Sequence, residues 1–506
     1  MHQGTDATGQ GGDDDPRGAA TAQCPVRHGG GPLPLHGGAA ADVPWARLRD
    51  TYGGLAPVEI SPGVPGWLLL GYKENLQVLR DQTYFSADPR PWSPSGRAPA
   101  RSGALTHDGE EHQRLRVPIV DALAQVGTAQ LVPVVERAAV RLVDAVSAEG
   151  RADLIGQFAA PLPALVLNEL FGLPDAYGHL LADLTERLWS GDPDRAEPAA
   201  LAIRAYFTGL VARKRTEPGD DITSRVLGHQ HSLTDDEAVE ALSLLWENGH
   251  EPTTHLIGNA LLRLLEDPAV WTAYLGGTLT VEDFLDYVMW TDSPLRILAG
   301  RYTTMDIRFS GARIRRGEPM LFGFSAAHAD QSAVRGGDDP GALTGNRSHL
   351  AWGAGAHRCP ATSFARELVR TAIDMAVDRL RGMVLAVETE DLRRRESMAV
   401  NGLAELPVWF TATGEKAQAT AEPAREAPRT RWVRRRRKPP SQGARYQAPL
   451  AQAAEEAPAV VRRSRPRPVA RKAPPALGAR YQAPFAREEP EPDSLERLLA
   501  TWRGRS

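Results

Sequence analysis

Cysteine is almost absent from this chain of 506 residues, which has only Cys24 and Cys359. Cys24 lies in a Gly-rich N-terminal stretch, so a disulfide between the two is not expected, and so few cysteines suit a reducing compartment. The chain also lacks any run of about 18 apolar residues, and its N-terminus has no basic segment followed by an apolar one. We therefore expect a cytoplasmic protein without a membrane anchor or a signal peptide.

Charges of the two signs are divided unevenly along the chain. The formal net charge is -4, but residues from Glu415 onward carry 18 Arg and 3 Lys against 10 Asp and Glu, which leaves -15 on residues 1–414. An acidic body therefore precedes a basic tail. The basic run Arg431–Lys438 does not by itself predict a nucleic-acid site, because basic runs in disordered segments are often only solvated.

Composition divides the chain into three segments. Residues 1–22 are rich in Gly, Asp and Ala, and residues 413–506 are mostly Ala, Pro and Arg, so we expect both to be disordered around a globular body at 23–412. The tail carries the heptad Gly-Ala-Arg-Tyr-Gln-Ala-Pro twice, at Gly443–Pro449 and at Gly478–Pro484. The two copies are either linear binding motifs used bivalently or the result of duplication within a spacer.

The chemistry of the body centres on Cys359, in the segment His349–Ala361. Glycines space this segment and a helix-favouring run follows it, so the sulfur should lie near a helix N-terminus, where the helix dipole and free N–H groups favour a thiolate. Such a thiolate can ligate a metal or haem iron, or attack a substrate as a nucleophile. A zinc site is disfavoured, because His357 and Cys359 offer only two ligands and no Cys-x-x-Cys occurs elsewhere.

The same segment resembles the haem-binding loop of the cytochrome P450 superfamily, whose pattern is Phe-Gly-x-Gly-x-His-x-Cys-x-Gly followed by Leu-Ala-Arg in the next helix. The matching residues are Gly353, Gly355, His357, Cys359, Ala365 and Arg366. The positions that depart from the pattern are Trp352, Ala361 and Phe364. The resemblance implies a triangular, mainly α fold with small β-sheets, in which Cys359 ligates the iron of haem b (iron protoporphyrin IX) and Gly353, Gly355 and His357 contribute to cofactor binding.

Four basic side chains are candidates for holding the haem propionates. His112 and Arg116 are four residues apart, so on a helix they share a face and can clasp one anionic group. A solvated charged face is the alternative for such a pair, but the segment resembles the His-x-x-x-Arg element that grips propionates in the family. By the same resemblance, Arg301 matches the strand arginine that meets a propionate, and His357 completes the set.

Several segments carry clear secondary-structure signals. Thr234–Glu237 is a capping box, and apolar residues then recur at helical spacing up to Glu266, which predicts a helix of about 32 residues and about 48 Å. Such a length suits the helix that crosses over the haem in the family. Strands are predicted at Val58–Ile60 and Trp67–Leu70, and Ile307–Ile314 alternates around a Gly turn as a hairpin does.

The middle of the long helix resembles the oxygen-activation element of the family, usually Ala-Gly-x-Glu/Asp-Thr-Thr. By that resemblance, Gly249 leaves space for dioxygen and Glu251 passes protons. The threonine that normally donates to bound oxygen is replaced by Pro252, which removes a helical N–H and clashes with the carbonyl of Asn248, at a cost of roughly 3 kcal/mol. Either Thr253 or water supplies the missing hydroxyl, or oxygen activation is impaired, or the proline is a plain helix kink.

A second departure precedes the Ser293-Pro294 turn. The family has Glu-x-x-Arg there, a buried ion pair that braces the haem loop, whereas this chain has Tyr287 and Trp290 at those positions. A buried ion pair can be replaced by well-packed apolar groups at little cost. We therefore interpret Tyr287 and Trp290 as a packed aromatic pair that braces the loop, with about 0.5–1.5 kcal/mol beyond its buried area.

These features predict a haem-thiolate monooxygenase that uses O₂ on a small organic substrate, with Gly249, Glu251 and Thr253 as catalytic residues. A ferredoxin, attracted by the basic tail, and its reductase would supply the electrons. The alternative is a haem-binding regulatory or scaffold protein of impaired activity; a third interpretation, a cysteine hydrolase, predicts no pigment. The substrate is not encoded in the expected pocket-lining loops at 89–101 and 189–205.

Overall fold

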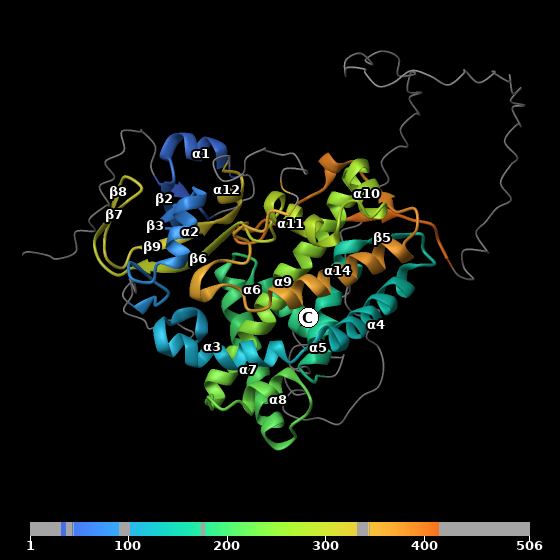
Figure 1. The fold of residues 1–506 in the computed structure, drawn as a ribbon, viewed down its shortest axis with the longest axis horizontal. Coiled ribbons are helices and arrows are strands. Elements are labelled where there is room, and N and C mark those ends of the chain that lie inside the picture. The colour runs from blue at the N-terminus through green and yellow to red at the C-terminus, as the bar shows by residue number, and fades with distance from the viewer. Residues whose placement is uncertain are drawn as a thin grey trace, which may run out of the picture.

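The computed structural model describes residues 32–36, 43, 45–90, 102–173, 178–330, 343 and 345–413. The expected N-terminal arm, Cys24, the basic tail and both heptads lie outside these residues. Helices gather around the long helix α9 at the centre of the molecule, and a sheet formed by the N-terminal strands and later strands lies to one side of them (Figure 1). The predicted class, mainly α with small sheets, is confirmed.

The described residues form three sheets. The largest has six strands in the order β1-β2-β3-β9-β6-β4, a second has three in the order β10-β11-β5, and β7 with β8 forms a hairpin. The strands are β1 Leu33–Pro34, β2 Leu55–Ser61, β3 Val64–Leu69, β4 Phe85–Ser86, β5 Arg151–Asp153, β6 Ile297–Thr303, β7 Ile307–Phe309, β8 Ala312–Ile314, β9 Pro319–Gly323, β10 Val384–Leu385 and β11 Pro407–Trp409.

Most of the core lies between helices. They are α1 Trp45–Tyr52, α2 Tyr72–Arg80, α3 Gly109–Ala124, α4 Thr128–Val146, α5 Pro161–Leu170, α6 Gly178–Leu188, α7 Pro193–Thr216, α8 Ile222–Leu227, α9 Asp235–Glu266, α10 Pro268–Leu275, α11 Val281–Thr291, α12 Phe324–His328 and α14 Thr362–Arg379. The largest cluster of buried apolar side chains joins α4, α5, α7, α9 and α14.

Helix α9 has the predicted bounds, with 32 residues from Asp235 to Glu266. The Thr234 hydroxyl accepts from the Glu237 N–H at 3.3 Å, and the Thr234 N–H donates to the Glu237 carboxylate at 2.9 Å, so the capping box is complete. Pro252 lies within the helix without ending it. Most side chains of α9 are buried, which explains how tertiary packing offsets the cost of the proline.

The predicted strands are confirmed. Val58–Ile60 falls within β2 and Trp67–Leu69 within β3, and these strands pair antiparallel around a turn in which Gly63 has φ +76°. The segment 307–314 is the β7-β8 hairpin.

The expectation of a pocket-lining loop across 189–205 is wrong beyond residue 192. Asp192 accepts from the Asp194 N–H and Pro193 occupies the first turn, so helix α7 begins there.

Within the described residues, no single helix has the length and apolar character to cross a membrane. The bent pair α3 and α4 has them jointly, by length and composition alone.

Candidate functional site

The loop that carries Cys359 depends on backbone conformations that glycine adopts readily. Gly353 has φ +67° and Gly355 φ +70°. A Cβ on Gly355 would also lie 2.5 Å from the carbonyl oxygen of Leu79 in α2, so this loop and α2 are in close contact. The Cys359 N–H donates to the Trp352 carbonyl at 2.8 Å, and α14 begins three residues after the cysteine. The cysteine therefore lies just ahead of a helix N-terminus, as predicted.

The electrostatics of Cys359 differ from the prediction. Burial raises the pKa of its thiol, although the Ala361 N–H and the Arg116 guanidinium act in the opposite direction. The helix N-terminus alone does not produce a thiolate, because desolvation costs the charged form more than these groups return. A metal cation that binds the sulfur displaces the thiol proton, so the surroundings remain suited to a metal thiolate.

Three of the four predicted basic residues lie at this loop: His112 and Arg116 reach it from α3, and His357 is part of it. The rings of His112 and His357 stack with centroids 4.0 Å apart. Arg116 donates to the carbonyl oxygen of Arg358, the residue before the cysteine. The fourth, Arg301 of β6, is near enough for its charge to lower the pKa of both His112 and His357. The structure thus brings the four residues together.

Among the described residues, neither Arg116 nor Arg301 forms an ion pair with a carboxylate. Arg301 is only 6% exposed, and its Nε, like the Nε2 of His112, is buried without a hydrogen-bond partner. Burial lowers the pKa of both guanidiniums and lowers that of His112 to about 4. Because a buried guanidinium without a counter-ion is costly, this arrangement fits an anionic ligand, and the two propionates predicted from the sequence have the right charge.

His357 has a second contact that the sequence did not reveal. Its Nε2 lies 3.1 Å from Oδ1 of Asp108, the N-cap residue of α3. Burial alone would raise the pKa of Asp108, but hydrogen bonds from His357, Ser86 and the Ala87 N–H lower it to about 2. Asp108 is therefore a carboxylate that orients the His357 ring between α3 and the cysteine loop.

One face of α9 is open in the middle of an otherwise buried helix. The residues on it retain exposed area and recur at helical spacing: Leu244, Leu245, Asn248, Gly249 and Pro252. A Cβ on Gly249 would lie 3.3 Å from the Leu167 side chain of α5, so close packing with α5 is a further reason for glycine there. The space for dioxygen at Gly249 stays a prediction.

Glu251 lies beside this open face, in a buried cluster of charges. It is 2% exposed, and its Oε1 accepts from the Arg395 guanidinium and from His255 Nε2 at 3.1 Å. The other oxygen, Oε2, lies 3.7 Å from His250 Nδ1. Burial would raise the pKa of Glu251, but Arg395 and His255 lower it to about 2. Glu251 is therefore a carboxylate at neutral pH.

The two threonines after Pro252 are both buried. Thr253 is 6% exposed, and the Thr254 hydroxyl is buried without a hydrogen-bond partner. Within the described residues no hydrogen bond joins Thr253 to Glu251, so the place of Thr253 in a proton relay stays a prediction. The structure places Glu251 in the predicted helix, where its contacts are His255 of the same helix and Arg395, 144 residues later in the chain.

The brace between α11 and the cysteine loop is not the purely aromatic one expected. Trp290 does reach the loop, because its Nε1 donates to the Asn346 carbonyl at 2.9 Å. The residue before Tyr287 is the fully buried Asp286, however, which pairs with His349 at 3.1 Å and with Arg366. A buried carboxylate is therefore still present, one position earlier than the Glu of the family pattern, and its cations come from outside the helix.

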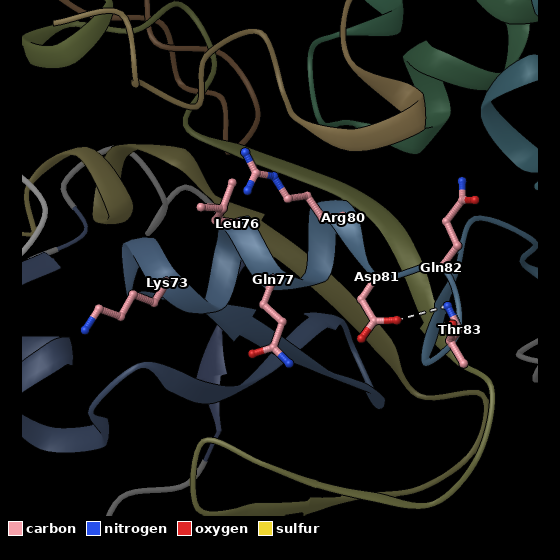
Figure 2. Close-up of a pocket in the computed structure, with 7 residues that line it drawn as sticks. All are labelled: Lys73, Leu76, Gln77, Arg80, Asp81, Gln82 and Thr83. Carbon is pink, nitrogen blue, oxygen red and sulfur yellow. Dashed lines mark hydrogen bonds between the residues drawn. The ribbon is translucent and has the colours of Figure 1, made fainter.

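A shallow groove follows α2 and the turn after it, between Lys73 and Thr83 (Figure 2). In that turn the Thr83 N–H donates to the Asp81 carboxylate at 3.0 Å. None of the predicted site residues lines the groove.

Within the described residues, no three His, Cys, Asp or Glu side chains are placed to share a metal ion, so Cys359 would be a single protein ligand.

Known proteins are similar to this chain over about three quarters of its length. The mycinamicin IV hydroxylase/epoxidase of Micromonospora griseorubida is 30% identical over 388 residues, which are 72% of this chain and 96% of that protein. The vitamin D3 dihydroxylase of Streptomyces griseolus is 30% identical over 382 residues, 72% of this chain and 92% of that one. The solved structure of CYP154C4 from Streptomyces sp. W2061 superposes with a TM-score of 0.68 at 28% identity, covering 75% and 97% of the two chains. No protein-family profile matches.

Proposed function

Because this chain belongs to the cytochrome P450 superfamily, we propose that it is a haem-thiolate monooxygenase that inserts one atom of O₂ into a small organic substrate. The observation that carries the proposal is the convergence of His112, Arg116 and Arg301 on the Cys359 loop without a carboxylate partner among the described residues. We assign the activity to residues 23–412. In support, relatives align over nearly their whole length with 72% of the chain.

The residues divide between binding and proton transfer. Cys359 would ligate the iron of haem b, His112, Arg116, Arg301 and His357 would bind its propionates, and Gly353 and Gly355 would keep the loop close to it. The bound cofactor would supply dioxygen activation, which a thiolate ligand favours by donating electron density.

In the middle of α9, the Glu251 carboxylate is held in its ionised form by its partners. At Oε1 it accepts hydrogen bonds from His255 and Arg395, and its pKa of about 2 keeps it ionised. Before Glu251 can carry a proton toward the open face of α9, its contact with Arg395 must loosen. Thr253 would be the next hydroxyl in this relay, and Gly249 would leave room for dioxygen.

The absorption spectrum of the purified protein, reduced and exposed to carbon monoxide, tests the proposal. We expect a strongly red-shifted Soret band, the sign of iron bound by a thiolate. Protein that stays colourless after haem is supplied during expression would contradict it, because then neither the cofactor nor the chemistry assigned to Cys359 is present.

The second candidate is a haem-binding regulatory or scaffold protein of impaired activity, and Pro252 is the observation that favours it. Pro252 lies on the open face of α9, where a threonine hydroxyl is expected in the family. Peroxide-driven turnover of a broad compound panel separates the two, since peroxide bypasses electron delivery. Product formation supports the monooxygenase, and silence from a protein with a red-shifted Soret band supports the second candidate.

Replacing Pro252 by threonine should raise both stability and the share of consumed electrons that appears in product. The variant restores an N–H for the Asn248 carbonyl and removes the clash of the ring, so we expect the free energy of unfolding to rise by about 1–3 kcal/mol. Urea unfolding and product yield measure the two effects. Pro252→Ala is the matched control, because it restores the N–H without the hydroxyl. Equal product yields from the two variants would mean that the hydroxyl is not the missing element.

The electrons would come from a ferredoxin and its reductase, and the tail carries the charge to attract an acidic partner. From Glu415 onward the chain has 21 basic against 10 acidic residues. We expect removal of residues 414–506 to weaken ferredoxin binding several-fold at low ionic strength. Salt near 1 M should abolish the difference, because charges more than about 3 Å apart are then screened from one another. Titration of the full and shortened proteins with the ferredoxin measures this. Equal affinity at low salt would rule the tail out.

A further inference from the structure

One buried carboxylate ties together the two sides of the Cys359 loop. Asp286, in α11, is 0% exposed. Its Oδ1 accepts from His349 Nε2 at 3.1 Å and from the Arg366 guanidinium, and Arg347 Nε lies 3.4 Å from its Oδ2. His349 and Arg347 precede the cysteine, and Arg366 follows it in the second turn of α14. The segments on either side of Cys359 are thus bonded to a single side chain.

The contacts of Asp286 are unequal in strength. His349 is buried and Arg366 is mostly shielded, so their bonds to the carboxylate form in surroundings of low polarity, where such pairs are strong. The Arg347 side chain is 67% exposed and contributes little. Burial would raise the pKa of Asp286, yet His349 and Arg366 lower it, which means that the ionised form is the stable one.

Aromatic and imidazole rings complete the support around the first half of the loop. Trp290 lies edge-on to His328 and to His349, with centroids 5.2 and 6.2 Å away, and stacks on Tyr72 of α2 at 6.1 Å. The Leu350 N–H donates to His328 Nε2 at 2.9 Å, so that ring nitrogen carries no proton. Burial lowers the pKa of His328 to about 3, which keeps the ring neutral. The rings therefore fix the path of the backbone that leads to Cys359.

We propose that Asp286 is the positioning residue for the cysteine ligand. Through His349 and Arg366 it braces the loop, as the Glu-x-x-Arg ion pair does in the family. The carboxylate stays in the helix, but its partners belong to the loop and to α14, so the brace holds the loop directly. This inference rests on the proposed haem site. Asp286 would act through His349 and Arg366, the two residues that bracket Cys359.

A merely structural role for Asp286 predicts lower stability with an unchanged spectrum. A positioning role predicts that loss of the carboxylate lets the loop relax, so that part of the bound iron loses its thiolate. The two are separated by haem content per chain and by the share of the reduced, carbon monoxide-bound protein that shows the red-shifted Soret band. Neither readout is an activity.

The experiment compares Asp286→Asn with Glu282→Gln in the full chain. Glu282 is an exposed carboxylate one turn earlier on the same helix, so its variant is the matched control. We expect the Asp286 variant to show a several-fold larger share of protein without the red-shifted band, and the Glu282 variant to match wild type. A folded Asp286→Asn protein with the wild-type band and haem content would overturn the inference.

Two further variants keep the test decisive if Asp286→Asn does not fold. His349→Leu removes one bond to the carboxylate, whereas His349→Gln keeps an N–H donor near the position of Nε2. We expect the leucine variant to lose part of the red-shifted band and the glutamine variant to recover it; equal spectra for the two would overturn the inference. If the wild-type protein itself lacks the red-shifted band, the proposed function fails. If the wild-type protein shows the band and the variants show it equally, only the positioning role fails.

Discussion

Replacing Cys359 by serine will abolish the red-shifted Soret band of the reduced, carbon monoxide-bound protein. Among the described residues Cys359 is the only cysteine, so no second thiol can take its place. A serine hydroxyl gives up its proton far less readily than a thiol and is a poor donor of electron density to iron. The shift of the band therefore depends on this one sulfur.

The control for this prediction is built into the chain, because Cys24→Ser removes the only other cysteine. That variant should keep the wild-type band. Measured side by side at equal haem supply, the pair separates the loss of the ligand from a general effect of removing sulfur. A red-shifted band that survives in the Cys359 variant would mean that the iron ligand has been assigned to the wrong residue.

Replacing Arg395 by methionine will destabilise the protein by about 3–5 kcal/mol at neutral pH, the range for breaking one side of a buried ion pair. Glu251 is 2% exposed and would keep a charge without its main cation. Of the groups that face it, His255 and His250 come from its own helix, and Glu186 of α6, 3.8 Å from Arg395, adds a second acid. Urea unfolding of wild type and variant at pH 7 measures the loss.

The effect of this substitution should depend on pH in a defined direction. In the folded wild type the pKa of Glu251 is lowered to about 2 from the ordinary 4.5. Its stabilising contribution is therefore complete above about pH 4.5 and disappears as the pH falls from there toward 2. In the variant, burial without Arg395 raises the pKa of Glu251, so protonation relieves it. The difference in stability between the two proteins should shrink on acidification.

Two companion variants make the result specific to the pair. Arg393→Met changes a neighbouring arginine whose pair with Glu405 is exposed, so we expect a loss within about 1 kcal/mol. Adding Glu251→Gln to Arg395→Met removes the stranded charge and should recover much of the stability. An Arg395 variant that loses no more than the Arg393 variant would show that the buried pair does not contribute to folding.

The parts of the fold that could be predicted are those with local signals. The start of α9 follows from a capping box that joins Thr234 to Glu237, three residues apart, and its end from the Pro268 that begins the next helix. Such signals depend on neighbouring atoms, so they survive any tertiary arrangement. The loop expected at 189–205 is wrong beyond residue 192, because Asp192-Pro193 is itself a local helix-start signal.

The candidate site divides along the same line. The amino-acid sequence by itself determined which residue we propose as the iron ligand, which glycines and basic residues we group with it, and the helix that carries Glu251, because short motifs and helical spacing encode them. Only the tertiary structure decided that Glu251 meets Arg395, 144 residues away, that His357 meets Asp108, and that Asp286 meets Arg366. It also decided that the Cys359 thiol has a raised pKa. These outcomes depend on burial and on which distant side chains are brought together, and both arise only when the chain has folded and the desolvation of each charge must be matched by a partner.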